Sequence, residues 1–318
     1  MSETLPLVIS DGPLDATVLG FIDNQVQLLP WTTLSEPIEQ PIAGLYTYGH
    51  PTVDASILDK LPDLKVISNY GVGVDHIDLQ AAAARGIPVG NTPDILNGAT
   101  ADQAMALLLA SGRRVVEGDH YARSPDFVTY DPGFMLGQEV HGATIGIIGL
   151  GRIGQEIAKR AYGFEMTILY HNRSPRDDAQ TLWGAVWRTL PDLLENSDYV
   201  VLSCPLTPET QHLIGVEELK QMKNTATLIN VARGGVVDTE ALYQAVENGW
   251  IRGAGLDVTD PEPLPRDHPL LKCPQVVITP HLGSATVQTR RAMAQLSVAN
   301  LLHGVTSQPL LRQVGQAT

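Results

Sequence analysis

Short apolar runs recur along the chain, and most are separated by segments with the spacing of amphipathic helices. In the first hundred residues these runs predict strands at 7–9, 26–29, 42–48, 66–70 and 88–89. The segments between them predict helices at 14–22, 53–61 and 79–85. Strands that alternate with helices are typical of a parallel sheet covered on both faces. The pattern therefore predicts an α/β fold for this part of the chain.

The alternation resumes after a long segment rich in Ala and Leu, which we expect to be a helix capped by Thr100. Beyond it the pattern predicts strands at 144–148, 166–170, 199–203, 227–231, 254–258 and 276–278, and helices at 155–162 and 190–195. Asp238 and Gly249 suit the start and the end of a further helix, and Thr286 suits the start of a last one that reaches about Leu302. At 318 residues the chain is long enough for two cores. We therefore expect two doubly wound parallel-sheet domains.

One glycine-rich turn stands out because a strand precedes it and a helix follows it. The turn reads Gly149-Leu150-Gly151-Arg152-Ile153-Gly154. Gly149 allows the tight turn, Gly151 lets a pyrophosphate approach the backbone, and Gly154 lets the helix pack closely on the strand. Unpaired N–H groups at the start of the helix attract the anion. The turn therefore predicts a dinucleotide-binding site.

Composition narrows the classes of partner and compartment. The formal net charge is −14 and the pI is about 4.9, so the surface repels nucleic acid and anionic membranes. No apolar run approaches the ~20 residues of a membrane span, and the first residues do not have the pattern of a secretory signal. The two cysteines and the scattered histidines do not have metal-ligand spacing. We expect a cytoplasmic protein that binds no metal.

The residues that follow the second strand of the dinucleotide unit indicate which cofactor is bound. NAD-preferring sites usually place a carboxylate there to accept hydrogen bonds from the ribose 2′-hydroxyl. This chain instead has Asn172-Arg173-Ser174, followed by Arg176. A guanidinium and a hydroxyl are suited to a 2′-phosphate. We therefore expect a preference for NADP(H), with NAD(H) as the poorer cofactor, although a solvated basic turn is the other interpretation.

Three ionisable side chains each follow a strand-like run near the end of the chain. They are Arg233, Glu262 and His281. Ligands of open parallel sheets gather at the carboxyl ends of the strands, so the three are expected to converge. Arg233 offers a fork of donors for a carboxylate and a carbonyl oxygen, while His281 can supply a proton and Glu262 can orient it. The set is suited to the reduction of a 2-oxo acid.

At this point the chain resembles the D-isomer-specific 2-hydroxyacid dehydrogenases, and most of all their glyoxylate/hydroxypyruvate reductase branch. The resemblance covers nearly the whole length. It is carried by the glycine turn, the Arg233 segment and the stretches NYGVGVD at 69–75, NTPD at 91–94, CPLTPET at 204–210, GLDV at 255–258 and PHLGS at 280–284.

The resemblance implies roles for individual residues. The family's catalytic trio falls on Arg233, Glu262 and His281, and backbone N–H groups at Val72 and Gly73 bind the substrate carboxylate across a cleft between domains, together with Arg233 and His281. The cofactor contacts that it implies fall on Arg152, Ile153, Cys204, Pro205, Thr210, Val231, Asp257 and His281. The other residues expected to bind the cofactor are the glycines of the turn, Gly149, Gly151 and Gly154, the stretch Asn172, Arg173 and Ser174, and Gly283.

The resemblance also implies an architecture. A flavodoxin-like substrate domain is expected at 1–98 and 287–318, since the last helix returns to it, and a Rossmann domain at 99–286. The enzyme is expected to be a homodimer built through the Rossmann domain, and the reaction to be NADPH-dependent reduction of glyoxylate or hydroxypyruvate to the D-2-hydroxy acid.

Other readings stay open within this resemblance. Mammalian members of the branch place Trp where Phe134 stands, so substrate preference does not carry over from that position. 2-Ketogluconate and hydroxyphenylpyruvate reductases are similar, whereas formate dehydrogenases have Gln where Glu262 stands. A binding protein of a different class, similar to the dinucleotide-sensing transcriptional corepressors, would keep the same trio.

Overall fold

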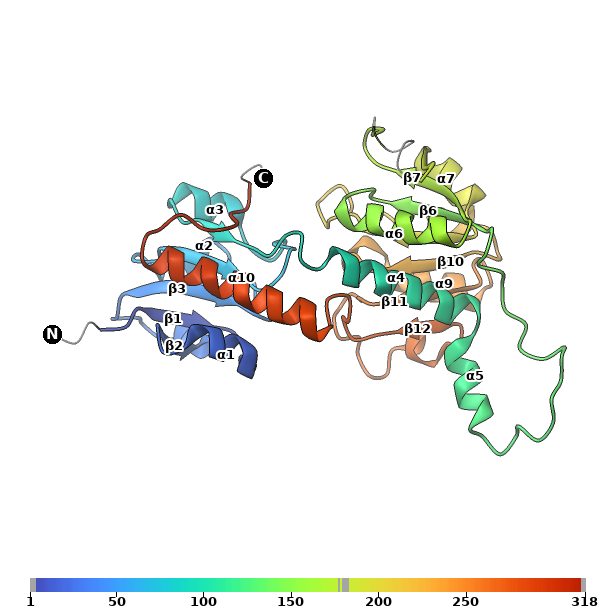
Figure 1. The fold of residues 1–318 in the computed structure, drawn as a ribbon, viewed down its shortest axis with the longest axis horizontal. Helices are drawn as coiled ribbons and strands as arrows, with labels where there is room; N and C mark the ends of the chain where they lie inside the picture. The colour runs from blue at the N-terminus through green and yellow to red at the C-terminus, as the bar shows by residue number, and fades with distance from the viewer. Residues whose placement is uncertain (1–3, 177, 179–182, 316–318) are drawn as a thin grey trace. The chain divides into compact units, whose positions relative to one another are not determined.

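The computed structural model describes residues 4–176, 178 and 183–315 of the chain (Figure 1). These residues form two compact units. The first unit contains the residues up to Leu96 and those from Thr286 onwards, and the second contains residues 97–285. The divisions therefore lie at 96/97 and 285/286, beside the 98/99 and 286/287 expected from the sequence.

The first unit is a five-stranded parallel sheet with helices on its faces. The strand order is β2-β1-β3-β4-β5, which is the flavodoxin-like order. Its strands are β1 Leu7–Ser10, β2 Gln27–Pro30, β3 Ile42–Thr47, β4 Val66–Asn69 and β5 Val89–Gly90. Its helices are α1 Ala16–Ile22, η1 Trp31–Ser35, α2 Ala55–Leu58, α3 Leu79–Ala84 and α10 Val287–Val305.

The last helix packs closely on the first unit, because two glycines let the backbones approach. A Cβ atom added at Gly304 of α10 would lie 2.3 Å from the Cβ of Val66 on β4. A Cβ at Gly44 of β3 would lie 2.9 Å from Cδ1 of Leu301. Any larger residue at these positions would push the helix off the sheet. Helix α10 is thus an integral part of the first unit.

The first unit fills its own topological switch point with a side chain. In a 2-1-3-4-5 sheet the crevice that receives a ligand opens between the carboxyl ends of β1 and β3. Asp11 directly follows β1, and its carboxylate oxygens accept hydrogen bonds from the N–H groups of Tyr48 and Gly49 after β3, at 2.5 and 2.7 Å. The two N–H groups that could hold an anion are therefore already used.

The second unit is a seven-stranded parallel sheet in the order β12-β11-β10-β9-β6-β7-β8, which has a Rossmann order at its centre. Its strands are β6 Thr144–Ile148, β7 Thr167–His171, β8 Val186–Trp187, β9 Tyr199–Leu202, β10 Thr227–Asn230, β11 Gly253–Leu256 and β12 Val276–Ile278. Its helices are α4 Asn97–Gly112, α5 Val115–Ala122, α6 Arg152–Gly163, α7 Leu190–Asn196, α8 Val216–Gln221, η2 Gly234–Val236, α9 Thr239–Glu247 and η3 Pro269–Lys272.

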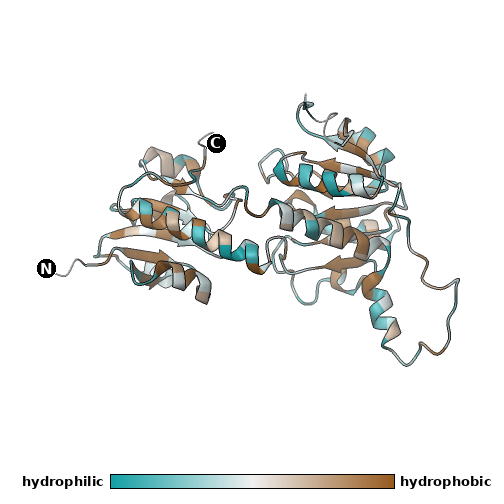
Figure 2. Ribbon diagram, viewed as in Figure 1, coloured by the Kyte–Doolittle hydropathy of each residue, from teal (hydrophilic) through white to brown (hydrophobic). Residues whose placement is uncertain are grey.

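Each face of this sheet has its own hydrophobic core, because the side chains of a strand alternate between the faces. Ile145 and Ile147 of β6 pack with α4 and α6, while Ile148 packs in the core that contains α7, α8 and α9. Tyr199 and Val201 of β9 likewise face α4 and α6. The strands are correspondingly the most uniformly hydrophobic elements in Figure 2. Both faces are covered by hydrophobic cores, which leaves the ends of the strands for ligands.

Several expected boundaries were wrong. Helix α4 begins at Asn97, so Thr100 lies inside its first turn and is not its cap. The Thr100 hydroxyl instead donates to the carbonyl oxygen of Gly283, at 3.2 Å. The helix expected at 53–61 is confined to α2, and α5 and α8 were not expected at all. Among the described residues, every helix is too short or too polar to cross a bilayer.

Candidate active site

The glycine turn after β6 has the geometry expected from its sequence. Gly149 has φ of +100°, and a Cβ there would lie 2.6 Å from the backbone nitrogen of Cys204. A Cβ at Gly154 would lie 2.2 Å from the carbonyl oxygen of Gly149, so the helix needs a glycine at this point. In contrast, a Cβ at Gly151, the N-cap of α6, would have no atom within 4 Å. The backbone at Gly151 is therefore open to a ligand.

Asn172 belongs to the wall of this turn. Its side-chain oxygen accepts the N–H of Leu150 at 2.7 Å, and its carbonyl oxygen accepts the indole N–H of Trp187 at 3.1 Å. The residue that most NAD sites use as a ribose acceptor is here an amide that fixes the glycine turn. Asn172 therefore positions the backbone of the glycine turn.

Two arginines follow Asn172, and only one of them forms an ion pair with a residue that the structure describes. Arg173 is exposed. A hydrogen bond from the Thr207 side chain lowers the pKa of Glu209, and the charge of Arg173 adds to this lowering. Arg176, considered as a helper from the sequence, instead forms a two-point ion pair with Asp178, with contacts of 2.9 and 2.7 Å. Ser174 is exposed beside Arg173.

The loop that follows β9 lines the other side of the switch point. Thr210 closes it, since its hydroxyl donates to the carbonyl oxygen of Pro205 at 2.7 Å and accepts the N–H of Thr207 at 2.8 Å. Burial raises the pKa of Cys204 to about 11, so this thiol is neutral near pH 7 and is not a nucleophile. Val231, after β10, is 7 % exposed.

The three expected catalytic residues follow three neighbouring strands. β10 pairs with β11, and β11 pairs with β12, so their last residues Asn230, Leu256 and Ile278 lie in register. Arg233 comes three residues after β10, and His281 comes three residues after β12. Glu262 lies in the loop after β11. Parallel register thus brings these loops to one edge of the sheet.

His281 and Glu262 are in direct contact. Nδ1 of His281 lies 2.7 Å from Oε1 of Glu262, and both side chains are partly exposed. The second carboxylate oxygen accepts the N–H of Thr259 at 3.4 Å, which holds the carboxylate in place. With Nδ1 bonded to Glu262, Nε2 is the ring nitrogen through which a proton can reach a substrate.

Asp257 builds the loop that carries His281. It is 2 % exposed, and its two carboxylate oxygens accept the N–H groups of Leu282 and Gly283, each at 2.7 Å. The Thr279 hydroxyl donates to it at 2.6 Å, and the N–H of His281 donates to its carbonyl oxygen at 2.9 Å. Hydrogen bonds of this kind compensate a buried charge. Asp257 therefore positions His281.

Arg233 is positioned by the residue at the end of its own strand. The amide of Asn230 donates to the carbonyl oxygen of Arg233 at 2.9 Å and accepts the N–H of Ala232 at 3.0 Å. The next residue, Gly234, packs so closely that a Cβ would lie 1.9 Å from the carbonyl oxygen of Thr259. The Arg233 loop is thus braced against the loop that carries Glu262.

In the first unit, the Val72–Gly73 turn has its carbonyl groups tied back. Asn69 donates to the carbonyl oxygens of Gly71 and Gly73, at 3.1 and 2.9 Å, and Asn91 donates to that of Val72 at 2.9 Å. Among the residues that the structure describes, no acceptor is recorded for the Val72 or Gly73 N–H. Two neighbouring amides with this freedom suit a carboxylate.

Sequence reasoning missed the residues that support the site. Gln103 on α4 donates to the Thr279 hydroxyl at 2.9 Å and to Asp257 at 3.4 Å, and no role was expected for it. A glutamine on a helix otherwise rich in Ala and Leu was the only sequence signal. Asn230 lay within a motif but carried no assigned role.

The chain is similar to known proteins over most of its length. A model of the D-isomer specific 2-hydroxyacid dehydrogenase NAD binding domain matches residues 105–283. The glyoxylate reductase of Pyrococcus horikoshii is 51 % identical over 265 residues, which are 82 % of this chain and 79 % of that protein. The glyoxylate reductase of Pyrococcus furiosus is 47 % identical over 278 residues, 86 % of this chain and 82 % of that protein.

Solved structures agree in fold over nearly the full length. A protein of Thermus thermophilus is 43 % identical with a TM-score of 0.88, covering 97 % of this chain and 99 % of that one. The NADPH-dependent glyoxylate/hydroxypyruvate reductase of Sinorhizobium meliloti, solved with NADP and malonate, is 33 % identical with a TM-score of 0.88, covering 98 % and 97 %.

Proposed function

This chain belongs to the D-isomer specific 2-hydroxyacid dehydrogenase family, and on that premise we propose that it is an NADPH-dependent reductase of glyoxylate or hydroxypyruvate. Membership makes it a dinucleotide-binding oxidoreductase of small 2-oxo and 2-hydroxy acids. The observation that carries the proposal is the contact of His281 with Glu262 at 2.7 Å, on strand exits next to that of Arg233.

The residues of the second unit fit a dinucleotide. The open backbone at Gly151 and the start of α6 would receive the pyrophosphate, because nothing lies within 4 Å of that position and the helix N-terminus attracts anions. Arg173 and Ser174 would hold the 2′-phosphate, which makes NADPH the preferred cofactor and NADH the poorer one. Support for this preference comes from the absence of a carboxylate at Asn172.

The chain's own side chains can complete the reduction once the cofactor is bound. The reduced nicotinamide supplies a hydride to the carbonyl carbon of the oxo acid. Arg233 would hold the carboxylate and polarise the carbonyl oxygen. His281 would hold a proton at Nε2 and give it to the developing alkoxide, while Glu262 fixes the ring through Nδ1. The product is the D-2-hydroxy acid, or achiral glycolate.

The Val72–Gly73 turn is proposed as a second group of donors for the substrate carboxylate. Its support is that Asn69 and Asn91 hold the carbonyl groups and leave the two amides oriented for an anion. We propose accordingly that the first unit is the substrate domain and that residues 97–285 form the dinucleotide domain.

The decisive experiment is steady-state oxidation of NADPH by a panel of oxo acids. We expect turnover with glyoxylate and hydroxypyruvate. Replacing His281 by Ala should lower kcat by about 10²- to 10⁴-fold and leave cofactor affinity near its original value, because only proton transfer is lost. The matched control is His120→Ala, which removes an exposed imidazole on α5 and should leave kcat unchanged.

Other outcomes would assign the chain differently. Preference for 2-ketogluconate or hydroxyphenylpyruvate would keep the chemistry and change the substrate. Tight NADPH binding without turnover on any oxo acid would favour a dinucleotide sensor. Near-normal turnover in His281→Ala would refute the role of His281 as the acid.

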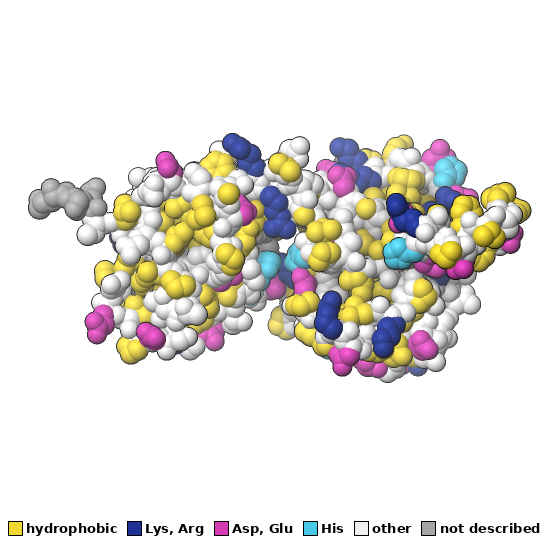
Figure 3. Space-filling view, turned by 90° about the horizontal axis from the view of Figure 1, so that it is seen from below, with side chains coloured by type: hydrophobic (Ala, Val, Ile, Leu, Met, Phe, Trp, Pro, Cys, Tyr) yellow, Lys and Arg dark blue, Asp and Glu magenta, His cyan; other side chains and the backbone are white. Residues whose placement is uncertain are grey.

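We further propose that the enzyme acts as a homodimer in the cytoplasm. Residues 123–139 leave α5 as a loop that extends away from the body of their unit (Figure 1) and returns to it at Leu136 and Gln138. Figure 3 shows hydrophobic side chains on this projection at the right-hand edge. Val128, Tyr130 and Leu136 are 84, 80 and 68 % exposed. Apolar exposure of this extent is typical of a surface that a partner covers. The two free cysteines suit a reducing compartment.

A further inference from the structure

The second unit contains a cavity at the edge of its sheet opposite to the catalytic residues. The cavity has a volume of about 270 Å³ and is lined at the sheet by Thr227 and Gly253, the first residues of β10 and β11. Arg233 and Asp257 follow the other ends of the same two strands. The cavity is therefore separate from the dinucleotide site and is not explained by the proposed reaction.

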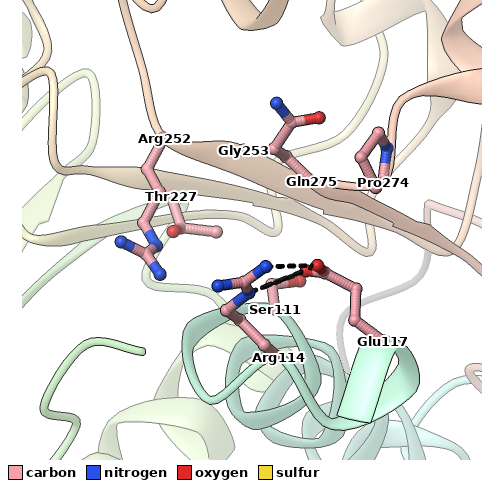
Figure 4. Close-up of a pocket in the computed structure, with 8 residues that line it drawn as sticks. All are labelled: Ser111, Arg114, Glu117, Thr227, Arg252, Gly253, Pro274 and Gln275. Carbon is pink, nitrogen blue, oxygen red and sulfur yellow. Dashed lines mark hydrogen bonds and ion pairs between the residues drawn. The ribbon is translucent and has the colours of Figure 1, made fainter. Parts of the chain in front are cut away.

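A guanidinium with unused donors faces this cavity. Arg252, just before β11, makes one side-chain hydrogen bond, from Nη2 to the carbonyl oxygen of Leu136 at 3.2 Å, and forms no ion pair with any residue that the structure describes. Figure 4 shows its side chain pointing into the same space as those of Thr227 and Arg114. An arginine offers five N–H donors, so most of this group's capacity remains for a ligand.

The cavity also contains a buried hydroxyl group that lacks a partner. Thr227 is 1 % exposed, and its Oγ1 has no hydrogen-bond partner among the described residues. Buried hydroxyl groups are almost always hydrogen-bonded in folded proteins, so this atom points to something that binds beside it. The hydroxyl of the neighbouring Ser111 differs, because it donates to the carbonyl oxygen of Ala254 at 3.4 Å.

The remaining charges in the lining set the charge of the ligand. Arg114 is paired with Glu117 through contacts of 2.6, 3.1 and 3.2 Å, so these two groups compensate each other. No carboxylate of the lining compensates the charge of Arg252. The lining therefore has a net charge of about +1, in a chain whose net charge is −14. A ligand with one negative charge balances this lining, whereas a dianion would leave an uncompensated negative charge in the cavity.

We propose that this cavity is a second binding site and that it takes a small monocarboxylate. The carboxylate accepts hydrogen bonds from the Arg252 guanidinium, and the Thr227 hydroxyl donates to its second oxygen. A planar carboxylate fits the fork of an arginine, and the small volume limits the ligand to a few carbon atoms. The Leu136 contact of Arg252 links the site to the projecting segment 123–139.

The test is calorimetric titration of the full-length protein with acetate and glycolate at constant ionic strength. Arg233→Ala removes the side-chain carboxylate donor of the proposed catalytic site and weakens binding there, so the part of the retained binding that depends on Arg252 reports the cavity. In that background Arg252→Gln should weaken the retained binding by about tenfold or more, the effect of one lost charge-assisted hydrogen bond. Thr227→Val, which keeps the volume, should weaken it by a smaller factor.

Matched controls separate this site from general effects of charge. Arg266→Gln removes another guanidinium of the same unit, whose one bonding partner among the described residues is the backbone carbonyl of Leu264, and should leave binding intact. Glu117→Gln should strengthen acetate binding, because it removes the negative charge from the lining. Neutral acetamide should not bind. Arg252→Gln alone should keep wild-type turnover, which distinguishes loss of this site from failure of the proposed reaction.

Four results would overturn the proposal. They are equal affinities for the parent and Arg252→Gln, loss of all carboxylate binding in Arg233→Ala, binding of acetamide as tight as that of acetate, and no carboxylate binding to the cavity in the parent protein. The last result would mean that ordered water or a second copy of the chain fills the space.

Discussion

Two arginines that follow β7 have the same charge and different surroundings. Arg176 is held by Asp178 and also donates from Nη1 to the carbonyl oxygen of Leu150 at 3.4 Å. Arg173 is exposed and forms no ion pair with the part of the chain that the structure describes. Only the Arg173 guanidinium can bind a phosphate without first breaking an ion pair with a carboxylate.

Replacing Arg173 by Ala should therefore raise the KM for NADPH by about 10- to 100-fold, because a charge-assisted hydrogen bond contributes about 1.5–3 kcal/mol. The KM for NADH should change little, since that cofactor has no 2′-phosphate. Steady-state kinetics with both cofactors measure the two effects.

Arg176→Ala is the internal comparison, and we expect it to leave the NADPH to NADH ratio of kcat/KM near that of the parent. Equal losses for NADPH and NADH in Arg173→Ala would show that this side chain does not read the phosphate.

At the scale of elements, folding and cofactor binding depend on two different glycines of the turn that leads into α6. Gly154→Ala should unfold or strongly destabilise the second unit, because its Cβ would lie 2.2 Å from the Gly149 oxygen. Gly151→Ala should keep the parent's Tm, because the added methyl group meets open space, and should weaken NADPH binding by roughly tenfold or more through a lost backbone contact. Thermal unfolding and fluorescence titration report the two properties.

Equal effects of Gly151→Ala and Gly154→Ala on Tm and on NADPH binding would contradict this division of roles. A Gly151→Ala protein that binds NADPH normally would mean that the pyrophosphate does not cross this backbone.

The N-terminus of α1 depends on one carboxylate. Burial opposes ionisation of Asp15, but hydrogen bonds from Val18 N–H, the Tyr48 hydroxyl and Thr17 N–H outweigh it and hold its pKa below the usual 3.8. A lowered pKa in the folded state adds stability that is complete above the unfolded value and disappears as the pH falls through the folded one.

Asp15→Ala should thus cost about 1 kcal/mol of unfolding free energy at pH 7, and the difference from the parent should shrink as the pH falls below about 3.8. Urea unfolding across this range measures it. Asp15→Asn retains an acceptor for the helix N–H groups and should lose less at pH 7. A deficit in Asp15→Ala that is unchanged at low pH would point to lost packing instead of lost charge.

The sequence predicted most of the elements because their apolar periods are regular. Asp238 and Thr286 were correctly expected to cap α9 and α10, since the side chain of each accepts an N–H of the first turn. Thr100 was misplaced because Asn97 and Gly98 before it look like loop residues, although α4 includes them. The short α8 lies in a polar stretch that gives little periodic signal.

The site was less accessible to sequence reasoning than the fold. Pairing of Glu262 with His281 followed from their chemistry and from strand order. The dependence of the His281 loop on Asp257 joins residues about 25 positions apart, and that of Asp257 on Gln103 joins residues 154 positions apart. Contacts at such separations leave no local pattern in the sequence. The Arg176 ion pair differs, because its partner Asp178 is only two positions away and was within reach of sequence reasoning, which overlooked it.

At the scale of the whole molecule, the acidic surface and the apolar projection have opposite effects on association. A net charge of −14 makes copies of the chain repel each other, so a dimer needs a local apolar contact. We expect a double substitution, Val128→Glu with Tyr130→Glu, to give monomers in light scattering after size-exclusion chromatography, while the parent is a dimer. Val287→Glu, at a position 82 % exposed on the first unit, should remain dimeric.

A parent protein that is monomeric at micromolar concentration would contradict the dimer. A variant that remains dimeric with both glutamates would place the interface elsewhere.

Asp11 has a consequence for how many nucleotides one polypeptide can carry. Both sheets are wound so that each has a crevice of the kind that holds phosphates, yet in the first of them a built-in carboxylate already serves as the anion. Binding stoichiometry should therefore be one dinucleotide per chain. For protein engineers, shortening this aspartate to glycine would uncover two backbone donors and offer a starting point for installing a flavin phosphate beside the native cofactor.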